Sequence, residues 1–147
     1  MEILRLSRAG SVAVFASLLL ATIAAVAKDG RDFAGFYSLT DVHEQGEQVQ
    51  VTLGLQIFNY SGADLRQAVV TVRQSHPGIA VLGTSAPIEL WRANARVIVK
   101  QDVTLSRDEF ERWSGHSQPA VFVVYRDASG QERQAWTQLS QRPAVPF

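Results

Sequence analysis

The segment from Gln48 to Asn59 alternates apolar and polar residues, and this pattern limits the fold of the chain more than any other feature. Successive side chains of a β-strand point to opposite faces, so the alternation predicts a strand with one buried face and one polar face. The apolar members of the pattern are Val49, Val51, Leu53, Leu55 and Ile57. The pattern therefore indicates a β domain in which this strand covers a core.

Several other segments also have the residue types of strands, and turn residues such as Asn59–Gly62 and Asp127–Gly130 separate them. Residues 120–125 form a continuous apolar run, which predicts a central strand covered on both faces. The remaining expected strands are 37–42, 65–74, 79–82, 88–91, 96–105 and 131–141. About seven short strands with regular turns predict an all-β fold, a two-sheet antiparallel β-sandwich of the immunoglobulin-like type.

Two details of these strands bear on function. In residues 96–105, Val97, Val99 and Val103 can share one face, which Gln101 interrupts. Residues 131–141 are polar and form the last expected strand, since Pro143 and Pro146 prevent further ladder bonding.

One short segment has a helical signal. Ser106 and Glu109 have the spacing of a capping box, in which each side chain bonds an otherwise unpaired backbone N–H. Phe110 and Trp113 would lie on one face of the resulting turn. We therefore expect a short crossover helix that plugs one end of the sandwich.

The N-terminus predicts the compartment. Arg5 and Arg8 precede an apolar stretch over residues 9–27, which ends in Ala25-Val26-Ala27. A basic head, an apolar middle and a small-x-small end are typical of a signal peptide. An N-terminal signal helix cleaved after Ala27, and a periplasmic or secreted product, are therefore expected. The competing hypothesis is an uncleaved segment that anchors the chain in a membrane, since the stretch is nearly long enough to span one.

These patterns divide the chain into four parts. Residues 1–27 are the expected signal peptide and residues 28–36 a flexible lead-in. Residues 37–142 form the expected sandwich domain, and residues 143–147 form a tail off the sheet.

Composition excludes some partners. The formal net charge is zero and no basic run is present, so the chain has no electrostatic reason to bind nucleic acid. Cysteine is absent, so an exported domain must be held together by packing alone. A membrane contact is expected only through an uncleaved signal segment.

Residues 49–65, continued by Val69–Val72, resemble the second-strand region of bacterial exported immunoglobulin-like and fibronectin-III-like domains, such as the CARDB type. The likeness consists of alternating apolar residues, the Asn-x-Ser-Gly turn at residues 59–62, and Leu65 at the start of the next strand. The chain departs from true immunoglobulin domains because it has no cysteine pair. The resemblance implies the fold class and a binding or scaffolding role, and it implies no site.

The histidines do not form a metal motif. His43, His76 and His116 are more than 30 residues apart and fall in expected loops, although Asp41 and Glu44 lie near the first. Metal sites usually show two ligands at short, fixed spacing. We expect solvated histidines, no metal and no cofactor.

Catalytic patterns are also missing. The sequence has no Gly-x-Ser-x-Gly elbow and no cysteine nucleophile. The acidic residues Asp108, Glu109 and Glu111 are explained as a solvated helix face with a capping role rather than as glycosidase carboxylates. The chain is therefore not expected to be an enzyme.

Aromatic residues on polar faces are the candidate partner surface. Phe58 and Trp136 lie on the polar faces of their strands, and Trp91 precedes Arg92. Exposed aromatic patches are common where proteins bind partners. The alternative is that these three residues cap the ends of the sandwich or pack under loops.

The leading hypothesis is a non-catalytic binding or scaffolding module of the cell envelope, whose partner is another envelope or secreted protein. One alternative is a periplasmic assembly or chaperone-like factor that offers residues 131–141 as a strand edge to a client. Another is a carrier of a small ligand or metal.

Overall fold

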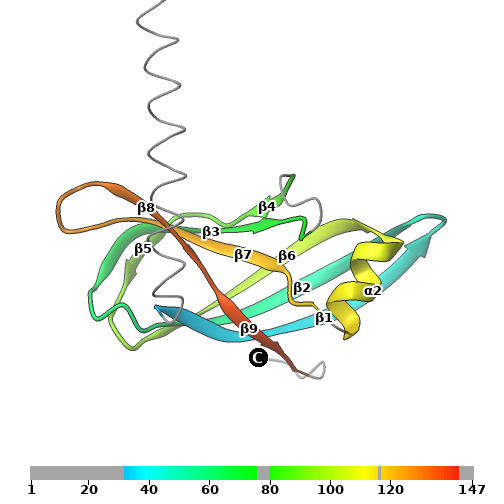
Figure 1. Cartoon of the computed structure of the whole chain (residues 1–147), viewed down its shortest axis with the longest axis horizontal. Helices are drawn as coiled ribbons and strands as arrows, with labels where there is room; N and C mark the ends of the chain where they lie inside the picture. Colours follow the sequence, from blue (N-terminus) through cyan, green and yellow to red (C-terminus); the bar gives the residue numbers. More distant parts are fainter. Residues whose placement is uncertain (1–31, 76–79, 116, 143–147) are drawn as a thin grey trace, which may run out of the picture.

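The computed structural model describes residues 32–75, 80–115 and 117–142. Within them, nine strands and one short helix form two stacked sheets (Figure 1). The predicted all-β, two-sheet sandwich with a single short helix is confirmed. The expected signal peptide, the tail over residues 143–147, His76 and His116 lie outside the described residues.

The first sheet is built around the alternating segment. Its four strands lie in the order β6 (Arg96–Ser106), β2 (Gln48–Asn59), β1 (Phe33–Gln45) and β9 (Gln138–Gln141). Strand β2 pairs antiparallel with both of its neighbours, with Leu55 opposite Tyr37 on one side and Val99 on the other. Strand β9 runs parallel to β1, so the sheets are not antiparallel throughout.

The second sheet has five strands. Its main path is β4 (Val81–Thr84), β3 (Leu65–Arg73), β7 (Ala120–Arg126) and β8 (Glu132–Trp136), and β5 (Ile88–Trp91) also pairs with β3. The apolar run predicted as a central strand is β7, which pairs with β3 on one side and β8 on the other.

The core lies between the two sheets. Leu53, Leu55 and Ile57 of β2 are fully buried, as are Val70 of β3 and Val123 of β7. Burying side chains of this size contributes about 1.5–3 kcal/mol each. The alternation in β2 therefore supplies one half of the core, and the second sheet supplies the other.

The expected lead-in is wrong for its last residues, because β1 begins at Phe33. Phe33 is completely buried and its ring contacts Trp91, with the ring centroids 5.4 Å apart. The same strand continues to Gln45, which places His43 in a strand rather than in the expected loop.

The expected last strand is in fact two strands in different sheets. The chain leaves β8 in the five-stranded sheet and enters β9 in the four-stranded sheet at Thr137, which is fully buried. The backbone N–H of Thr137 donates to the carbonyl of Val121 at 2.9 Å. This crossing closes one side of the sandwich.

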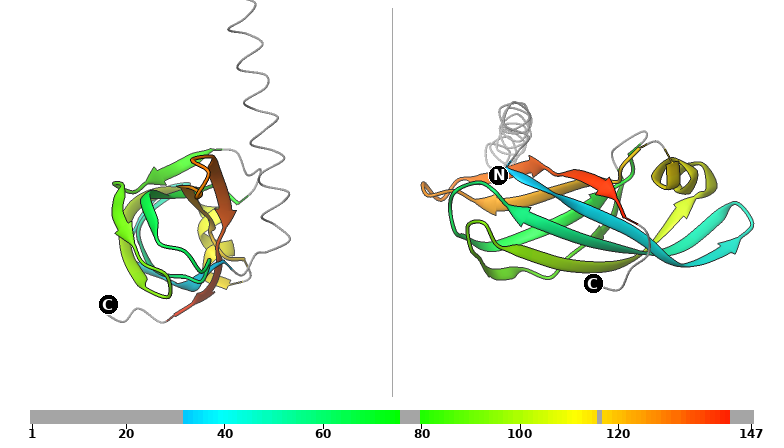
Figure 2. Two further views of the ribbon diagram at one scale, coloured as in Figure 1. Left: turned by 90° about the vertical axis from the view of Figure 1, so that its left-hand side faces the viewer. Right: turned by 90° about the horizontal axis from the view of Figure 1, so that it is seen from below.

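Helix α2 (Arg107–Gly115) connects β6 to β7 and lies at one end of the sandwich (Figure 2). The Ser106 hydroxyl accepts a hydrogen bond from the Glu109 N–H at 3.2 Å, as the capping box predicts. Trp113 is fully buried, and its carbonyl accepts a hydrogen bond from the Tyr37 hydroxyl. The predicted crossover helix is confirmed. No helix in the described part of the chain is long and apolar enough to span a membrane.

Candidate functional site

The three aromatic residues expected to form a partner surface lie in three different places. Trp91 is 1% exposed, packs on Phe33, and donates its indole N–H to the carbonyl of Ala95 at 3.0 Å. A partner role for Trp91 is therefore wrong, because β5 pairs with the start of β3 and turns this side chain into the core.

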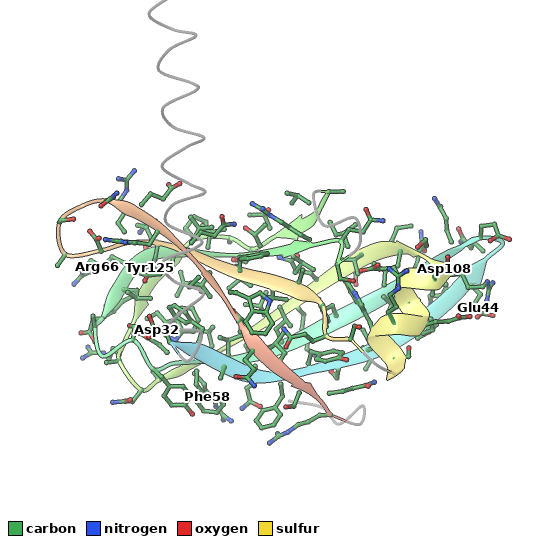
Figure 3. All side chains as sticks on the ribbon, viewed as in Figure 1. Asp32, Glu44, Phe58, Arg66, Asp108 and Tyr125 are labelled. Carbon is green, nitrogen blue, oxygen red and sulfur yellow. The ribbon has the colours of Figure 1, made fainter. Side chains whose placement is uncertain are left out.

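Phe58 lies on the outer face of the four-stranded sheet. Its half-buried ring stacks on Tyr60, with centroids 5.8 Å apart and an angle of 7° between the ring planes. Tyr60 is 52% exposed. This pair is a small aromatic surface near the pole of the molecule where β1 begins (Figure 3).

Trp136 lies on the outer face of the other sheet. It is 38% exposed and stands opposite Phe122 in the β7–β8 pair. The guanidinium of Arg73 lies over the Phe122 ring, 5.2 Å from its centroid. Because Phe58 and Trp136 belong to opposite outer faces, the two cannot contact one partner as a single patch.

The acidic residues of α2 differ from the expected solvated face. Asp108 and Glu111 are exposed, but Glu109 is 1% exposed. Its Oε1 accepts hydrogen bonds from the Ser75 N–H at 2.6 Å, from the Ser75 hydroxyl, and from the Trp113 indole N–H at 2.8 Å. Glu109 therefore joins α2 to the segment after β3 instead of reaching back to cap the helix.

The other titratable groups do not form a reactive cluster among the residues that the structure describes. No three histidine, cysteine, aspartate or glutamate side chains gather there in a way that could hold a metal ion. His43 is exposed on β1.

A cavity of about 560 Å³ lies at the pole opposite α2, between the β2–β3 loop and the β7–β8 hairpin. Tyr125, Asp32 and Arg66 line this cavity (Figure 3). Burial raises the pKa of Tyr125, and the charges of Asp32 and Asp127 raise it further against the opposing effect of Arg133. A phenol with a raised pKa stays protonated at neutral pH, so it can donate a hydrogen bond but cannot act as a base.

The feature that sequence reasoning missed is the edge formed by β6. This strand has 11 residues and pairs only with β2, over Gln48–Phe58. Its other side has no neighbouring strand in the described chain. The predicted edge over residues 131–141 does lie at sheet edges, but β8 has five residues and β9 has four.

A groove runs beside this edge. It has a volume of about 600 Å³ and lies between residues 83–88 of the β4–β5 segment and residues 98–102 of β6. Ile98 is 46% exposed beside it. The edge and the groove together form an open seam along one side of the sandwich, opposite the side that the Thr137 crossing closes.

Gln101 is the unusual residue of this seam. Its side chain interrupts the inward row of valines on β6, and its buried Oε1 has no hydrogen-bond partner within the described residues. A Cβ atom added to Gly83 would come within 2.1 Å of this oxygen, so the absence of a side chain at Gly83 makes room for the amide. The interruption at Gln101 is visible in the sequence, and it was the available signal for this site.

Comparisons with known proteins add two partial likenesses. No protein-family model and no curated protein matches the chain. A GH20 exo-β-N-acetylglucosaminidase from Vibrio harveyi, solved with N-acetylglucosamine, is 15% identical over 79% of this chain, with a TM-score of 0.45. The chain spans 19% of that enzyme's length. A protein from Archaeoglobus fulgidus is 11% identical, with a TM-score of 0.30, over 69% of this chain and 99% of its own.

Proposed function

We propose that this chain is a non-catalytic, exported binding and scaffolding module of the cell envelope, and that it holds its partner by strand addition at β6. The observation that carries the proposal is the 11-residue edge of β6, which runs beside an open groove. The proposal combines the scaffolding hypothesis with the strand-edge hypothesis. It assigns the binding edge to residues 96–106 instead of residues 131–141.

Strand addition uses the unpaired backbone N–H and C=O groups of an edge strand. In an antiparallel pair, half of the backbone N–H and C=O groups of β6 point away from β2, and these groups can pair with an incoming strand. Each net hydrogen bond contributes about 0.5–1.5 kcal/mol, so several of them along β6 would support a stable complex. The groove gives room for the side chains that the incoming strand turns toward the second sheet.

Export and the immunoglobulin-like family type are part of the proposal. The basic head at Arg5 and Arg8 and the small residues before Lys28 support export with cleavage after Ala27. The resemblance of residues 49–65 to bacterial exported immunoglobulin-like domains supports a binding or scaffolding role. The mass of the protein recovered from its own host tests the processing step, since a chain beginning at Lys28 is expected and an intact Met1 would indicate the anchored alternative.

Site-specific photo-crosslinking tests the binding edge. A photoreactive amino acid replaces Ile98 on β6 in the full-length chain, expressed in its own host. The matched control replaces Val42, which is 42% exposed on β1 and does not line the groove. We expect protein adducts from position 98 and none of the same mass from position 42. The absence of adducts at position 98, or the same adducts from both positions, would contradict the proposal.

A further inference from the structure

We infer that the strand added to β6 is β6 of a second copy of this chain, paired antiparallel around a two-fold axis at Gln101. The inference rests on the proposed function, because it names the partner for the same edge. The support for self-pairing comes from the side chains that would lie opposite each other in the two copies.

Geometry restricts the possible registers. A two-fold axis perpendicular to the sheet keeps inward-facing residues facing inward in both copies, so opposed residues must come from the same face of β6. The axis must therefore lie between one residue of β6 and the same residue of the second copy. An axis between two successive residues would oppose residues from different faces. Each choice of central residue then fixes every opposed pair along the strand.

The register centred on Gln101 places opposite charges together. Lys100 of each copy lies opposite Asp102 of the other, so the pair occurs twice on the outer face. Opposed charges stabilise a strand pair, whereas like charges destabilise it. Asp102 is held in place by the Thr52 hydroxyl, which donates to its Oδ1 at 2.7 Å. Lys100 makes no ion pair with any described residue, which leaves it available.

The neighbouring registers are less favourable. An axis at Lys100 places Lys100 opposite itself, and an axis at Asp102 places Asp102 opposite itself. An axis at Val99 pairs Arg96 with Asp102, but it sets the Gln101 amide against the alkyl side chain of Val97. Of these registers, only the one centred on Gln101 places opposite charges against each other and also places the polar amide opposite another polar amide.

This register would give the Gln101 amide a hydrogen-bond partner. Its Oε1 is buried without a hydrogen-bond partner in the described chain, which is a costly state for an acceptor. An amide carries both donors and acceptors, so two opposed Gln101 side chains that rotate from Gly83 toward the axis can each donate to the other. On the same inward face, Val99 lies opposite Val103 and Val97 lies opposite Leu105, so apolar residues flank the amide pair.

The result is a continuous sheet of two four-stranded halves, each with the strand order β9-β1-β2-β6 running toward the axis. Both five-stranded sheets lie on the same side of it, because the axis is perpendicular to the shared sheet. The two grooves then face each other across the axis.

Single-cysteine variants test the register, because the chain has no cysteine of its own. Directly opposed residues have Cα atoms about 4.5–5.5 Å apart, which suits a disulfide. We expect the exported full-length Gln101→Cys variant to form a disulfide-linked dimer under mild oxidation. The control Val99→Cys should form no disulfide-linked dimer alone and should crosslink only when mixed with Val103→Cys. Efficient crosslinking of Val99→Cys alone would overturn the register.

A charge swap tests the same pairing without cysteines, and it remains informative if Gln101→Cys does not fold. Sedimentation equilibrium measures the dimer dissociation constant of the unmodified protein and its variants. We expect Lys100→Glu to weaken the dimer at least tenfold, and the double variant Lys100→Glu/Asp102→Lys to restore it. Equal weakening in the double variant would overturn the proposed contact.

The outcomes also separate the two proposals. A protein that stays monomeric, while position 98 still crosslinks to a foreign protein, overturns self-pairing and leaves strand addition at β6 standing. A monomer with no adducts at position 98 overturns both. A dimer that forms equally well with Lys100→Glu overturns self-pairing through β6.

Discussion

Glu109 is a fully buried acidic residue whose carboxylate oxygens are all partnered. Its carboxylate accepts hydrogen bonds from the backbone and hydroxyl of Ser75 and from the indole of Trp113. Arg112 adds an ion pair at 3.6 Å. A buried carboxylate is tolerated when its oxygens are satisfied in this way. The residue therefore acts as a clamp between α2 and the end of β3.

Removing this clamp should destabilise the fold. We expect Glu109→Ala to lower the free energy of unfolding by about 2–4 kcal/mol, because the half-buried Ser75 N–H and the buried Trp113 indole lose their acceptor. Urea denaturation followed by circular dichroism measures the change. Glu111→Ala, an exposed position on the same helix, is the control and should change stability by less than about 0.5 kcal/mol. Equal losses from the two variants would show that Glu109 is not a clamp.

Two tryptophans, Trp91 and Trp136, should differ in how much they contribute to stability. We expect Trp91→Ala to cost about 3–5 kcal/mol, since it empties a fully buried ring position. Trp136→Ala, at a residue that is 38% exposed, should cost about 1 kcal/mol or less. Thermal or urea unfolding compares the two. A large loss from Trp136→Ala would mean that this ring has a structural role on the outer face.

Single residues were predicted only where local pattern decides their position. The polar-face positions of Phe58 and Trp136 follow from alternation along one strand. The burial of Trp91 depends on Phe33 and on the pairing of β5 with β3, which are contacts between distant parts of the chain. The burial of Glu109 likewise depends on Ser75, which a capping motif does not report.

At the scale of elements, the β7–β8 hairpin is organised by Asp127. Its Oδ1 accepts hydrogen bonds from the Ser129 and Gln131 N–H groups at 2.9 and 3.0 Å, and its Oδ2 accepts one from Arg133 at 2.8 Å. The Ser129 hydroxyl also donates to this carboxylate. Hydrogen bonds from Ser129 and Arg133 hold the pKa of Asp127 far below its ordinary value of 3.8.

Because this pKa is lowered, the stability of the hairpin should fall at low pH. A lowered pKa in the folded state stabilises the fold above the unfolded pKa of 3.8, and this contribution is lost as the pH falls through the folded value. We expect the amides of residues 127–132 to stay ordered between pH 7 and pH 4 and to lose order at lower pH. Amide NMR spectra recorded against pH measure this. Asp127→Asn should remove the transition, while Asp108→Asn should retain it; a transition unchanged in Asp127→Asn would assign it to another group.

Elements were predicted well where turn residues or alternation mark them. The missed boundaries have a different cause. Phe33 and Gly35 belong to a strand because β2 offers them partners, and Gly35 lies so close to the β2 backbone that an added Cβ would meet the Gln56 carbonyl at 1.8 Å. The division of residues 131–141 occurs at Thr137, a residue type that favours strands and so marks no break.

At the scale of the whole molecule, the two sides of the sandwich differ. On one side the chain passes between the sheets at Thr137, and Gln118 secures the crossing. Its Nε2 donates to the Thr137 carbonyl at 2.7 Å, and its Oε1 accepts from the Leu139 N–H at 2.9 Å. The other side is the seam along β6. The class of fold was predictable from strand pattern, but the open side was not, because it depends on which strands pair.

Removing the Gln118 side chain should loosen the closed side alone. We expect Gln118→Ala to lower the free energy of unfolding by about 1–3 kcal/mol, since two backbone groups lose their partner. Hydrogen exchange should accelerate for the amides of β9 and remain unchanged for those between β2 and β6. Uniform acceleration across both sheets would show that Gln118 contributes to global stability and not to this crossing.

The closed crossing at Thr137 also sets the stoichiometry of any assembly built by strand pairing. A sandwich with a long free edge on each side could add copies without limit and grow into a ribbon. Here β6 is the longest free edge in the described chain. On the opposite side β8 and β9 have five and four residues, and the part of β1 that β9 leaves unpaired, Ser38–Gln45, is interrupted by a bulge between Thr40 and His43. A complex formed through β6 therefore has only short or bulged edges left to offer, and bulges oppose further strand pairing. This difference between the two sides favours a finite complex over a fibre.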